Sequence, residues 1–422
     1  MIMKYLYILQ QALVWLMIVY WIYNLIIAFC ALIRLKDKPL KVNKKHKFMI
    51  IIPAHNEEKV IGNLIESLNG LDYPKELYDV FVIEDNCTDK TGQIAKKLGC
   101  KVYTRNDESR KTKGYALNWF LAKVLEEKLE YDAFAVIDAD NVVDANFLNA
   151  MNKKLCQGET VIQGYKDIKN PTDTWISSGY ALFYWTQHRF YHLARYNVGL
   201  SPLMNGTGFV VKFDVIKDTG WNTKTLTEDV EFSLMNIANG NKLGWAIDAI
   251  VYDEQPTSFK ESWKQRTRWT KGHMQIFKHY TKDLAKGVAK NKTMASFDGL
   301  VYIMCVPVIV ISLLLIIVNF VMWTLEKMTF GKMLLSVFSM LAAGYAAYAL
   351  SGVVILLMDK RPLKRMWKGI LLYPFFMASW AILNFLCLFK RDVKWEKIEH
   401  VKAVSIDEMP EHNSRARKSK YE

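Results

Sequence analysis

The sequence has few cysteines, and none of them has the spacing of a metal or redox site. Six cysteines occur among 422 residues, without a CxxC pair or the ligand spacing of a zinc site. We therefore expect inert thiols in a reducing compartment rather than a disulfide framework. The chain also has no GxxxxGK[ST] phosphate loop, no GxSxG elbow, no Ser-His-Asp order and no His-rich metal spacing. Nothing in it therefore indicates a P-loop nucleotidase or a serine hydrolase.

Acidic residues are also in the minority. The 56 Lys and Arg outnumber the 42 Asp and Glu, which gives a formal charge of +14. Such a charge suits nucleic acid, anionic lipid or an anionic substrate. Much of the excess lies beside long apolar segments and not on a separable basic module. This arrangement favours a lipid bilayer as partner and predicts no binding of nucleic acid.

Apolar segments long enough to cross a bilayer lie at both ends of the chain. The first runs from Tyr5 to Ile33, which is longer than the apolar part of a cleaved signal peptide. Only Lys4 precedes it, whereas seven Lys and Arg follow between residues 34 and 47. This asymmetry predicts an outer N-terminus and a cytosolic segment after it, and together with the later apolar segments it predicts a multi-pass protein of the cell membrane. The later segments are Leu300 to Trp323, Met333 to Met358 and Gly369 to Phe389.

The last apolar segment poses a conflict of topology. Both the loop from Asp359 to Lys368 and the tail after Lys390 are basic, so both should be cytosolic. A single crossing by residues 369–389 would put them on opposite sides of the membrane. Either this segment is re-entrant or interfacial around Pro374, or the charge rule fails here.

The middle of the chain alternates short apolar runs with helical patterns. We expect strands at 48–53, 79–84, 101–104 and 134–138, with helices between them and Thr88 as the cap of one. This order predicts a mainly parallel α/β sheet whose ligands bind at the carboxyl ends of its strands. Two further segments, 181–200 and 260–280, are amphipathic helices of the membrane interface or ordinary surface helices. The predicted domains are 1–34 (membrane helix), 48–255 (sheet domain), 256–292 (interfacial), 293–390 (membrane region) and 391–422 (basic cytosolic tail).

Acidic clusters follow two of the predicted strands. Asp138 and Asp140 form a D-x-D, whose hard carboxylate oxygens suit Mg²⁺ or Mn²⁺ together with a diphosphate. Such a pair also solvates loops or caps helices. Asp85, in Glu84-Asp85-Asn86, can accept hydrogen bonds from a base or ribose, although the cluster also suits the start of a helix.

Two helical segments carry further candidates. Thr227 is a good N-cap, and it would hold Asp229 in the first turn as a general base or as a partner of the helix dipole. Gln265, Arg268 and Trp269 form Q-x-x-R-W, in which the Arg can grip phosphate and the Trp can stack on a sugar ring. The alternative is an interfacial helix with snorkelling arginines.

Seven motifs in this order resemble the processive family 2 glycosyltransferases, which include cellulose, hyaluronan, poly-N-acetylglucosamine and mixed-linkage glucan synthases. The resemblance covers roughly residues 48 to 275, and it implies a GT-A-type sheet domain inserted between membrane and interfacial helices. The motifs are IIPAHNEE (Ile51 to Glu58), IEDNCTD (Ile83 to Asp89), KGYALN (Lys113 to Asn118), DAD (Asp138 to Asp140), NGTG (Asn205 to Gly208), TED (Thr227 to Asp229) and QRTRW (Gln265 to Trp269).

The resemblance implies a role for each matching residue. Asp229 is then the catalytic base, Asp85 reads the uracil base, and Asp138 and Asp140 hold UDP and Mg²⁺ or Mn²⁺. The remaining donor-side residues are Ala54, Glu57, Lys113, Gln265, Arg268 and Lys271. His273, like Lys271, is expected to contact phosphate. The acceptor-side residues are Asn205, Gly206, Thr207, Glu228 and Trp269. Glu84 departs from the Asp of many relatives but leaves Asp85 in place.

The implied activity is inverting transfer from UDP-glucose or UDP-N-acetylglucosamine to a growing β-linked polysaccharide, with export through the protein's own membrane channel. The sequence does not indicate whether the protein has partner subunits. Two rival functions also stay open: a non-processive lipid-linked sugar transferase and a non-catalytic sugar-binding subunit.

Overall fold

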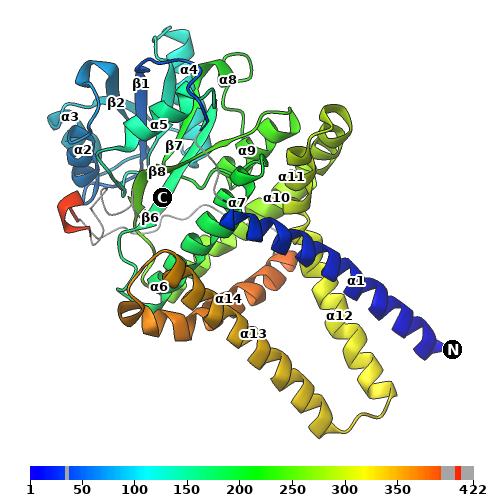
Figure 1. The fold of residues 1–422 in the computed structure, drawn as a ribbon. Helices are drawn as coiled ribbons and strands as arrows, with labels where there is room; N and C mark the ends of the chain where they lie inside the picture. The colour runs from blue at the N-terminus through cyan, green and yellow to red at the C-terminus, as the bar shows by residue number, and fades with distance from the viewer. Residues whose placement is uncertain (34–37, 391–403, 410–422) are drawn as a thin grey trace.

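A computed structural model describes residues 1–33, 38–390 and 404–409 (Figure 1). The described part contains one sheet, with strand order β3-β2-β1-β4-β7-β6-β8-β5. The strands are β1 Phe48–Ala54, β2 Tyr78–Asp85, β3 Lys101–Arg105, β4 Ala133–Val136, β5 Val142–Val143, β6 Val161–Ile168, β7 Phe209–Lys212 and β8 Gly244–Asp253.

The sheet is parallel where the sequence predicts alternating strands and helices. β1 pairs in parallel with β2 and β4, and β2 pairs in parallel with β3. β6 and β8 are also parallel, whereas β7 runs antiparallel to β4 and β6, and β5 to β8. The carboxyl ends of β1, β2 and β4 therefore lie together at one edge of the sheet.

Helices cover both faces of the sheet, and three more extend away from it (Figure 1). The fourteen described α-helices are α1 Ile2–Phe29, α2 Ile61–Asn69, α3 Thr91–Lys97, α4 Lys113–Glu126, α5 Phe147–Cys156, α6 Trp175–Gln187, α7 Ala194–Asn197, α8 Phe213–Ile216, α9 Glu228–Ala238, α10 Phe259–Asn291, α11 Met294–Ile303, α12 Cys305–Leu325, α13 Phe330–Met358 and α14 Leu363–Phe389. Between α6 and α7 the chain continues as a π-helix, His188–Leu193.

The alternation of β1 explains the two layers of helices. Ile50 and Ile52 face a core built with α2 and α5, whereas Met49 and Ile51 face a core built with α4 and α9. All four of these side chains are buried, because the side chains of a central parallel strand pack on both faces of the sheet. The predicted α/β fold with a mostly parallel sheet is confirmed.

The long apolar helices fall into two groups. α14 packs along α6, α10 and α13, whereas α1 packs on α12. Figure 1 shows α1, α12 and α13 extending away from the sheet, while α14 stays beside α6. Among the described residues, α1 with its short continuation to Leu32, α12, α13 and α14 are long and apolar enough to cross a membrane.

Two local predictions have definite outcomes. Thr88 as a helix cap is wrong, because α3 begins at Thr91, whose backbone N–H donates to the Asp89 carboxylate at 3.0 Å. Thr227 does stand at the N-cap of α9, but its side chain makes no capping hydrogen bond. The predicted tail lies outside the described residues except for 404–409.

Candidate active site

One cavity of about 630 Å³ lies at the carboxyl ends of β1, β2 and β4 and continues to the C-terminal helices. Most of the residues that the motifs single out line it. They are Ala54, Glu57, Asp85, Lys113, Asp138, Asp140, Asn205, Gly206, Glu228, Asp229, Gln265, Arg268, Trp269 and His273. Residues far apart in the sequence therefore meet because parallel strands end at one edge of the sheet.

Asp85 lines the cavity at the end of β2. It is buried, and one of its oxygens accepts a hydrogen bond of 2.6 Å from Arg105 at the end of β3. Burial raises the pKa of Asp85, although the Arg105 charge opposes the shift. The ion pair orients the carboxylate toward a cavity that Ala54 and Glu57 also line.

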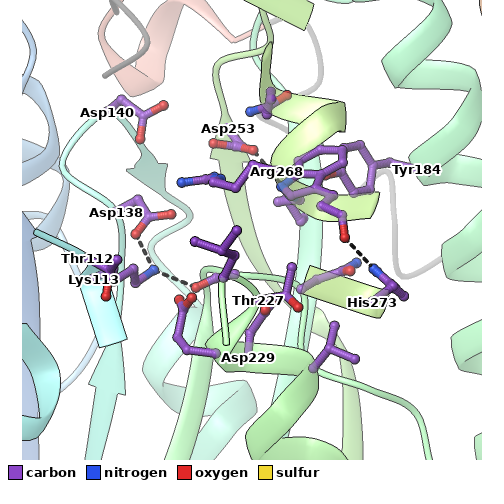
Figure 2. A pocket seen from close by; sticks show the side chains of 18 of the residues that line it. Thr112, Lys113, Asp138, Asp140, Tyr184, Thr227, Asp229, Asp253, Arg268 and His273 are labelled. Carbon is purple, nitrogen blue, oxygen red and sulfur yellow. Dashed lines mark hydrogen bonds and ion pairs between the residues drawn. The ribbon is translucent and has the colours of Figure 1, made fainter. Parts of the chain in front are cut away.

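Lys113, the first residue of α4, links two strand ends. Its ammonium group forms an ion pair with the Asp138 carboxylate and donates to the Gly206 carbonyl at 2.6 Å. Burial alone would lower the pKa of Lys113, but the negative charges of Asp138 and Glu228 outweigh it and raise that pKa. Figure 2 shows the Lys113 side chain directed at Asp138. Lys113 is therefore a fixed cation beside the D-x-D.

Behind the D-x-D, Thr207 and Asn141 hold the loop in shape. The backbone N–H of Asp138 donates to the Thr207 hydroxyl at 3.0 Å, and that hydroxyl donates to Asn141 at 2.6 Å. Asn141 in turn donates to Asp140 at 3.2 Å and to Asp253 at 2.8 Å. Thr207 is fully buried and does not line the cavity, so it supports the loop instead of meeting a ligand there.

Glu228 and Asp229 begin α9, and both line the cavity. Burial and the neighbouring Asp229 charge raise the pKa of Glu228 to about 7, against the opposing effect of Lys113 and Arg268. Asp229 lies next to Gly206, since a Cβ on Gly206 would be 3.9 Å from its carboxylate oxygen. Figure 2 shows Asp229 on the same side of the cavity as Lys113.

Gln265 and Arg268 present polar atoms without partners. Within the described residues, the buried Oε1 of Gln265 and Nε of Arg268 have no hydrogen-bond partner. Figure 2 shows the Arg268 guanidinium directed toward the side of the cavity that carries Asp138 and Asp140. A buried polar group without a partner is costly, and a ligand is one way to satisfy it. An anion between Arg268 and the D-x-D would accept a hydrogen bond from the Arg268 Nε, whereas the Gln265 oxygen would need a ligand that donates.

Trp269 is the start of an aromatic wall. Its ring lies 6.3 Å from Tyr184 and 6.0 Å from Trp380, centroid to centroid. His273, one turn on, hydrogen-bonds to the Trp269 carbonyl and, at 2.6 Å, to the Tyr302 hydroxyl. Burial lowers the pKa of His273, so this ring is a neutral support for α10.

Lys271 lies away from the other motif residues. Its ammonium group donates to the carbonyls of Cys387, at 3.0 Å, and Lys390 at the end of α14. Gln265, Arg268 and Trp269 follow the i, i+3, i+4 spacing of one helix face, whereas Lys271 is two residues past Trp269 and faces elsewhere. Lys271 therefore holds two helices together and does not line the cavity.

The motifs missed part of the cavity wall. Asp253 is the last residue of β8 and Glu254 follows it, so the expectation of acidic residues at strand ends also applies to this pair. Lys166 of β6 lies 3.3 Å from Asp253 and over the Tyr184 ring. Burial opposes its charge, but Tyr184 and Asp253 raise the pKa of Lys166. Met377, Trp380, Ala381 and Asn384 of α14 also line the cavity, and no local pattern marks them.

The D-x-D suits a metal that shares its ligands with a substrate. The described residues contain no group of three or more His, Cys, Asp or Glu side chains arranged to hold a metal ion. Asp138 and Asp140 line the same cavity, and Asp138 already binds a cation in the form of Lys113. Mg²⁺ and Mn²⁺ commonly take one or two carboxylates and complete their shell with phosphate oxygens and water. The donor set therefore fits such an ion only when a phosphate ligand is present.

A family model described as glycosyltransferase-like family 2 matches residues 46–272, more than half of the chain. The chain belongs to glycosyltransferase family 2. The resemblance of its motifs to this family is thereby confirmed, and the matched region contains the sheet and every motif quoted above.

Relatives within the family differ in their acceptors. The chain is 30% identical over 273 residues to a β-monoglucosyldiacylglycerol synthase of Nostoc, covering 60% of this chain and 55% of the relative. It is 23% identical over 391 residues to a poly-β-1,6-N-acetyl-D-glucosamine synthase of Staphylococcus epidermidis, covering 87% and 89%. The chain spans about half the length of several other curated relatives that it matches.

A solved structure shares the fold. It is a mannosyltransferase from Pyrobaculum calidifontis in complex with GDP-mannose and Mn²⁺, with a TM-score of 0.54 and 15% identity. The match covers 89% of this chain and 99% of that one. At this identity the likeness shows a common GT-A-like fold.

Proposed function

We propose that the protein is a membrane-bound, inverting glycosyltransferase that adds sugars from UDP-glucose or UDP-N-acetylglucosamine to a growing β-linked polysaccharide. One observation carries the proposal: a single cavity joins the strand-end acids, Asp229 and Trp269 to residues of the membrane helices. A donor and an acceptor can therefore meet at Asp229, with the donor over the sheet and the acceptor toward the membrane.

The sheet end of the cavity supplies the donor site. Asp85, fixed by Arg105, accepts hydrogen bonds from the base. Lys113 and Arg268 neutralise the diphosphate, and the Gln265 amide nitrogen donates a hydrogen bond to it. The partnerless Arg268 Nε supports this role, because a phosphate oxygen would satisfy it. Mg²⁺ or Mn²⁺ held by Asp138 and Asp140 would supply further positive charge to the leaving diphosphate.

Asp229 acts as the general base at the centre of the cavity. It accepts the proton of the acceptor hydroxyl as that oxygen attacks the anomeric carbon from the face opposite the diphosphate. One displacement inverts the centre, so an α-linked donor yields a β-linkage. Asn205, Gly206 and Glu228 border the acceptor side.

The membrane arrangement is part of the proposal. α1, α12 and α13 span the bilayer, with the catalytic domain in the cytosol, and α14 lies in the interface. Arg266, fully buried, donates from α10 to the Phe376 carbonyl at 3.2 Å, near the middle of α14. The bilayer centre is a costly place for such an arginine. An interfacial α14 keeps both basic segments cytosolic and removes the conflict of topology.

Full-length similarity supports a polysaccharide product. The Staphylococcus synthase aligns through the membrane helices as well as the sheet domain, covering 87% of this chain. In this proposal the product leaves past α12 and α13, whose Cys305 and Tyr348 line the membrane end of the cavity.

A lipid-linked transferase is the second candidate. The glucosyldiacylglycerol synthase of Nostoc is more similar in sequence, at 30% identity, although over a shorter segment. The same apolar residues, Cys305 and Tyr348, would then meet the lipid portion of the acceptor.

The test uses membranes containing the full chain, a panel of radiolabelled UDP-sugars with GDP-mannose added, and Mg²⁺ or Mn²⁺. We expect high-molecular-weight label from one UDP-sugar, lost with chelator and with Asp229→Asn, and cleaved by a β-specific glycosidase. Label found only in the lipid extract would establish the second candidate. An absence of transfer from every donor would contradict both and favour a non-catalytic subunit.

A further inference from the structure

The helical segment after α6 changes its winding beside the active-site cavity. α6 ends at Gln187, His188–Leu193 form a π-helix, and α7 continues from Ala194. A π-helix closes its hydrogen bonds between residues five positions apart, and such turns are rare outside functional sites. The contacts of the side chains on this turn therefore indicate what the change of winding achieves.

The π-helix brings Gln187 and His192 to the same side chain, Asn205. The amide nitrogen of Asn205 donates to Gln187 Oε1 at 3.3 Å and lies 3.3 Å from His192 Nε2. In an α-helix, two residues five positions apart would point about 140° away from each other around the axis. With hydrogen bonds from i to i+5 they lie one above the other on the same side. The change of winding therefore lets both residues reach one amide group.

These two contacts use both hydrogens of the Asn205 amide nitrogen. An amide nitrogen only donates, so His192 accepts through Nε2 and carries its proton on Nδ1. Burial lowers the pKa of His192 well below its usual value, so the ring stays neutral. Within the described residues, the Asn205 oxygen accepts no hydrogen bond. Because Asn205 lines the cavity, this oxygen is the atom left to accept a hydrogen bond from a ligand.

The backbone of Asn205 is fixed separately, by Gln163 of β6. The Asn205 N–H donates to Gln163 Oε1 at 2.8 Å, and the Gln163 amide nitrogen donates to the Thr207 carbonyl at 3.0 Å. Gln163 is fully buried. With the backbone held in this way, the freedom that remains to Asn205 is rotation of its side chain. Gln187 and His192 restrict that rotation.

The His192 ring is itself locked by packing. It stacks on the indole of Trp245, with the centroids 4.8 Å and the planes 10° apart. The neighbouring His188 ring lies 5.3 Å from the same indole, and its Nε2 donates to the Lys166 carbonyl at 2.8 Å. All three rings are buried. A polar group supported by such packing holds its hydrogen-bond partner in one geometry.

We propose that Gln187 and His192 are positioning residues, which turn the Asn205 oxygen toward the acceptor sugar so that it accepts a hydrogen bond from a hydroxyl or acetamido N–H. The inference rests on the proposed function, in which Asn205 borders the acceptor side of the cavity. It deepens that function by assigning a donating group of the sugar to this position. Gln187 lines the cavity as well, whereas His192 does not, so His192 can act on a ligand only through Asn205.

The experiment measures initial rates of UDP release by the full chain in nanodiscs, with UDP-glucose or UDP-N-acetylglucosamine as donor and cellobiose or chitobiose as acceptor. His192→Phe keeps a ring that can stack and removes the accepting nitrogen, whereas His192→Gln supplies an accepting oxygen instead. Gln187→Met tests the same amide from outside the buried stack. Asn205→Ala is made alone and with His192→Phe. His279→Phe, at an exposed position outside the cavity, is the matched control.

We expect His192→Phe and Gln187→Met to raise the KM for the acceptor by up to about tenfold, the factor of one hydrogen bond. The kcat should change by less than about twofold, because the contact is equal in the ground and transition states. His192→Gln should stay close to wild type. Once Asn205→Ala has raised the KM, adding His192→Phe should raise it no further. UDP affinity with Mn²⁺ should stay constant throughout, and His279→Phe should match wild type.

Two results would overturn the positioning role and leave the proposed function intact. One is an unchanged KM for the acceptor in both His192→Phe and Gln187→Met. The other is a further rise when His192→Phe is added to Asn205→Ala, which would make His192 a packing residue that acts independently of Asn205. Failure of the proposed function has a different signature. If wild type releases no UDP with either acceptor, or transfers sugar only to lipid, the polysaccharide function falls and the positioning role falls with it.

Discussion

Lys113 and Asp138 form an ion pair at the point where the family is expected to bind a metal–diphosphate complex. The same ammonium group donates to the Gly206 carbonyl at 2.6 Å, so it is held from two sides. A metal at Asp138 must therefore compete with a cation that belongs to the chain. This competition links metal binding to the arrival of phosphate groups, which can take over the Lys113 charge.

Lys113→Met should change metal binding in the absence of nucleotide. We expect Mn²⁺ to bind the variant more tightly than wild type, by about tenfold, because Asp138 loses its competing cation. UDP should bind more weakly. Electron paramagnetic resonance of free and bound Mn²⁺ measures the first effect without any need for turnover.

Lys111→Met is the control for the metal experiment. Lys111 also lines the cavity, but its ion pair is with Glu108. Its loss should leave the affinity for Mn²⁺ close to that of wild type. Equal Mn²⁺ affinity in Lys113→Met and wild type would show that Lys113 does not compete with the metal.

Asp229→Asn should abolish transfer while sparing the donor site. We expect kcat to fall by at least about 100-fold, the usual contribution of a general base, with UDP affinity unchanged. Asp218→Asn, at an exposed position outside the cavity, should keep full activity. Substantial turnover by Asp229→Asn would instead assign the base to another group, with Glu228 the nearest alternative.

Glu228→Gln should make stability less dependent on pH. The pKa of Glu228 is about 7 in the folded protein, compared with 4.5 for an unperturbed glutamate side chain. Between these values the folded protein keeps a proton that the unfolded chain has lost, so rising pH lowers the stability of wild type. Above about pH 7 the loss is complete, whereas below pH 4.5 it is absent.

The measurement is the difference in Tm between Glu228→Gln and wild type without metal or nucleotide. This difference should be more positive near pH 8 than near pH 5, because glutamine carries no charge to bury. A difference that stays the same over this range would mean that Glu228 has an ordinary pKa in the folded protein.

Gly272→Ala should separate α10 from the start of α9. An added Cβ would lie 2.6 Å from Thr227 Cγ2, so the helices must move apart or strain. We expect a loss of about 1–3 kcal/mol in stability and a fall in kcat, since Arg268 and Asp229 lie on the two helices. Thermal unfolding and initial rates measure the two effects.

Two variants check this packing explanation. Thr227→Ala with Gly272→Ala should recover part of the lost stability, because it removes both the hydroxyl and the methyl group that clash with the added Cβ. Gly344→Ala on α13, where an added Cβ meets nothing within 4 Å, should be neutral or slightly stabilising. No recovery in the double variant would locate the strain elsewhere.

Local sequence determined much of the sheet domain. Apolar runs such as that from Phe48 form strands, and Asp85 and Asp138 stand at or just after strand ends. They share one cavity because the parallel topology brings those ends together. The position of Asp229 in the first turn of a helix was likewise predicted, from Thr227 as the N-cap. These predictions depend only on residues close in sequence, so they hold whatever the tertiary contacts of the segment are.

Only the tertiary structure decided which residues share the cavity. Lys271 and Arg268 belong to one basic stretch, yet Lys271 binds the end of α14 while Arg268 points toward Asp138. Gly206 lines the cavity, whereas the adjacent Thr207 is buried behind the D-x-D and does not line it. By length and composition α14 could cross a membrane, and its place beside α10 depends on contacts from Arg266, over a hundred residues away. Contacts of that kind are formed between elements, so no local pattern records them.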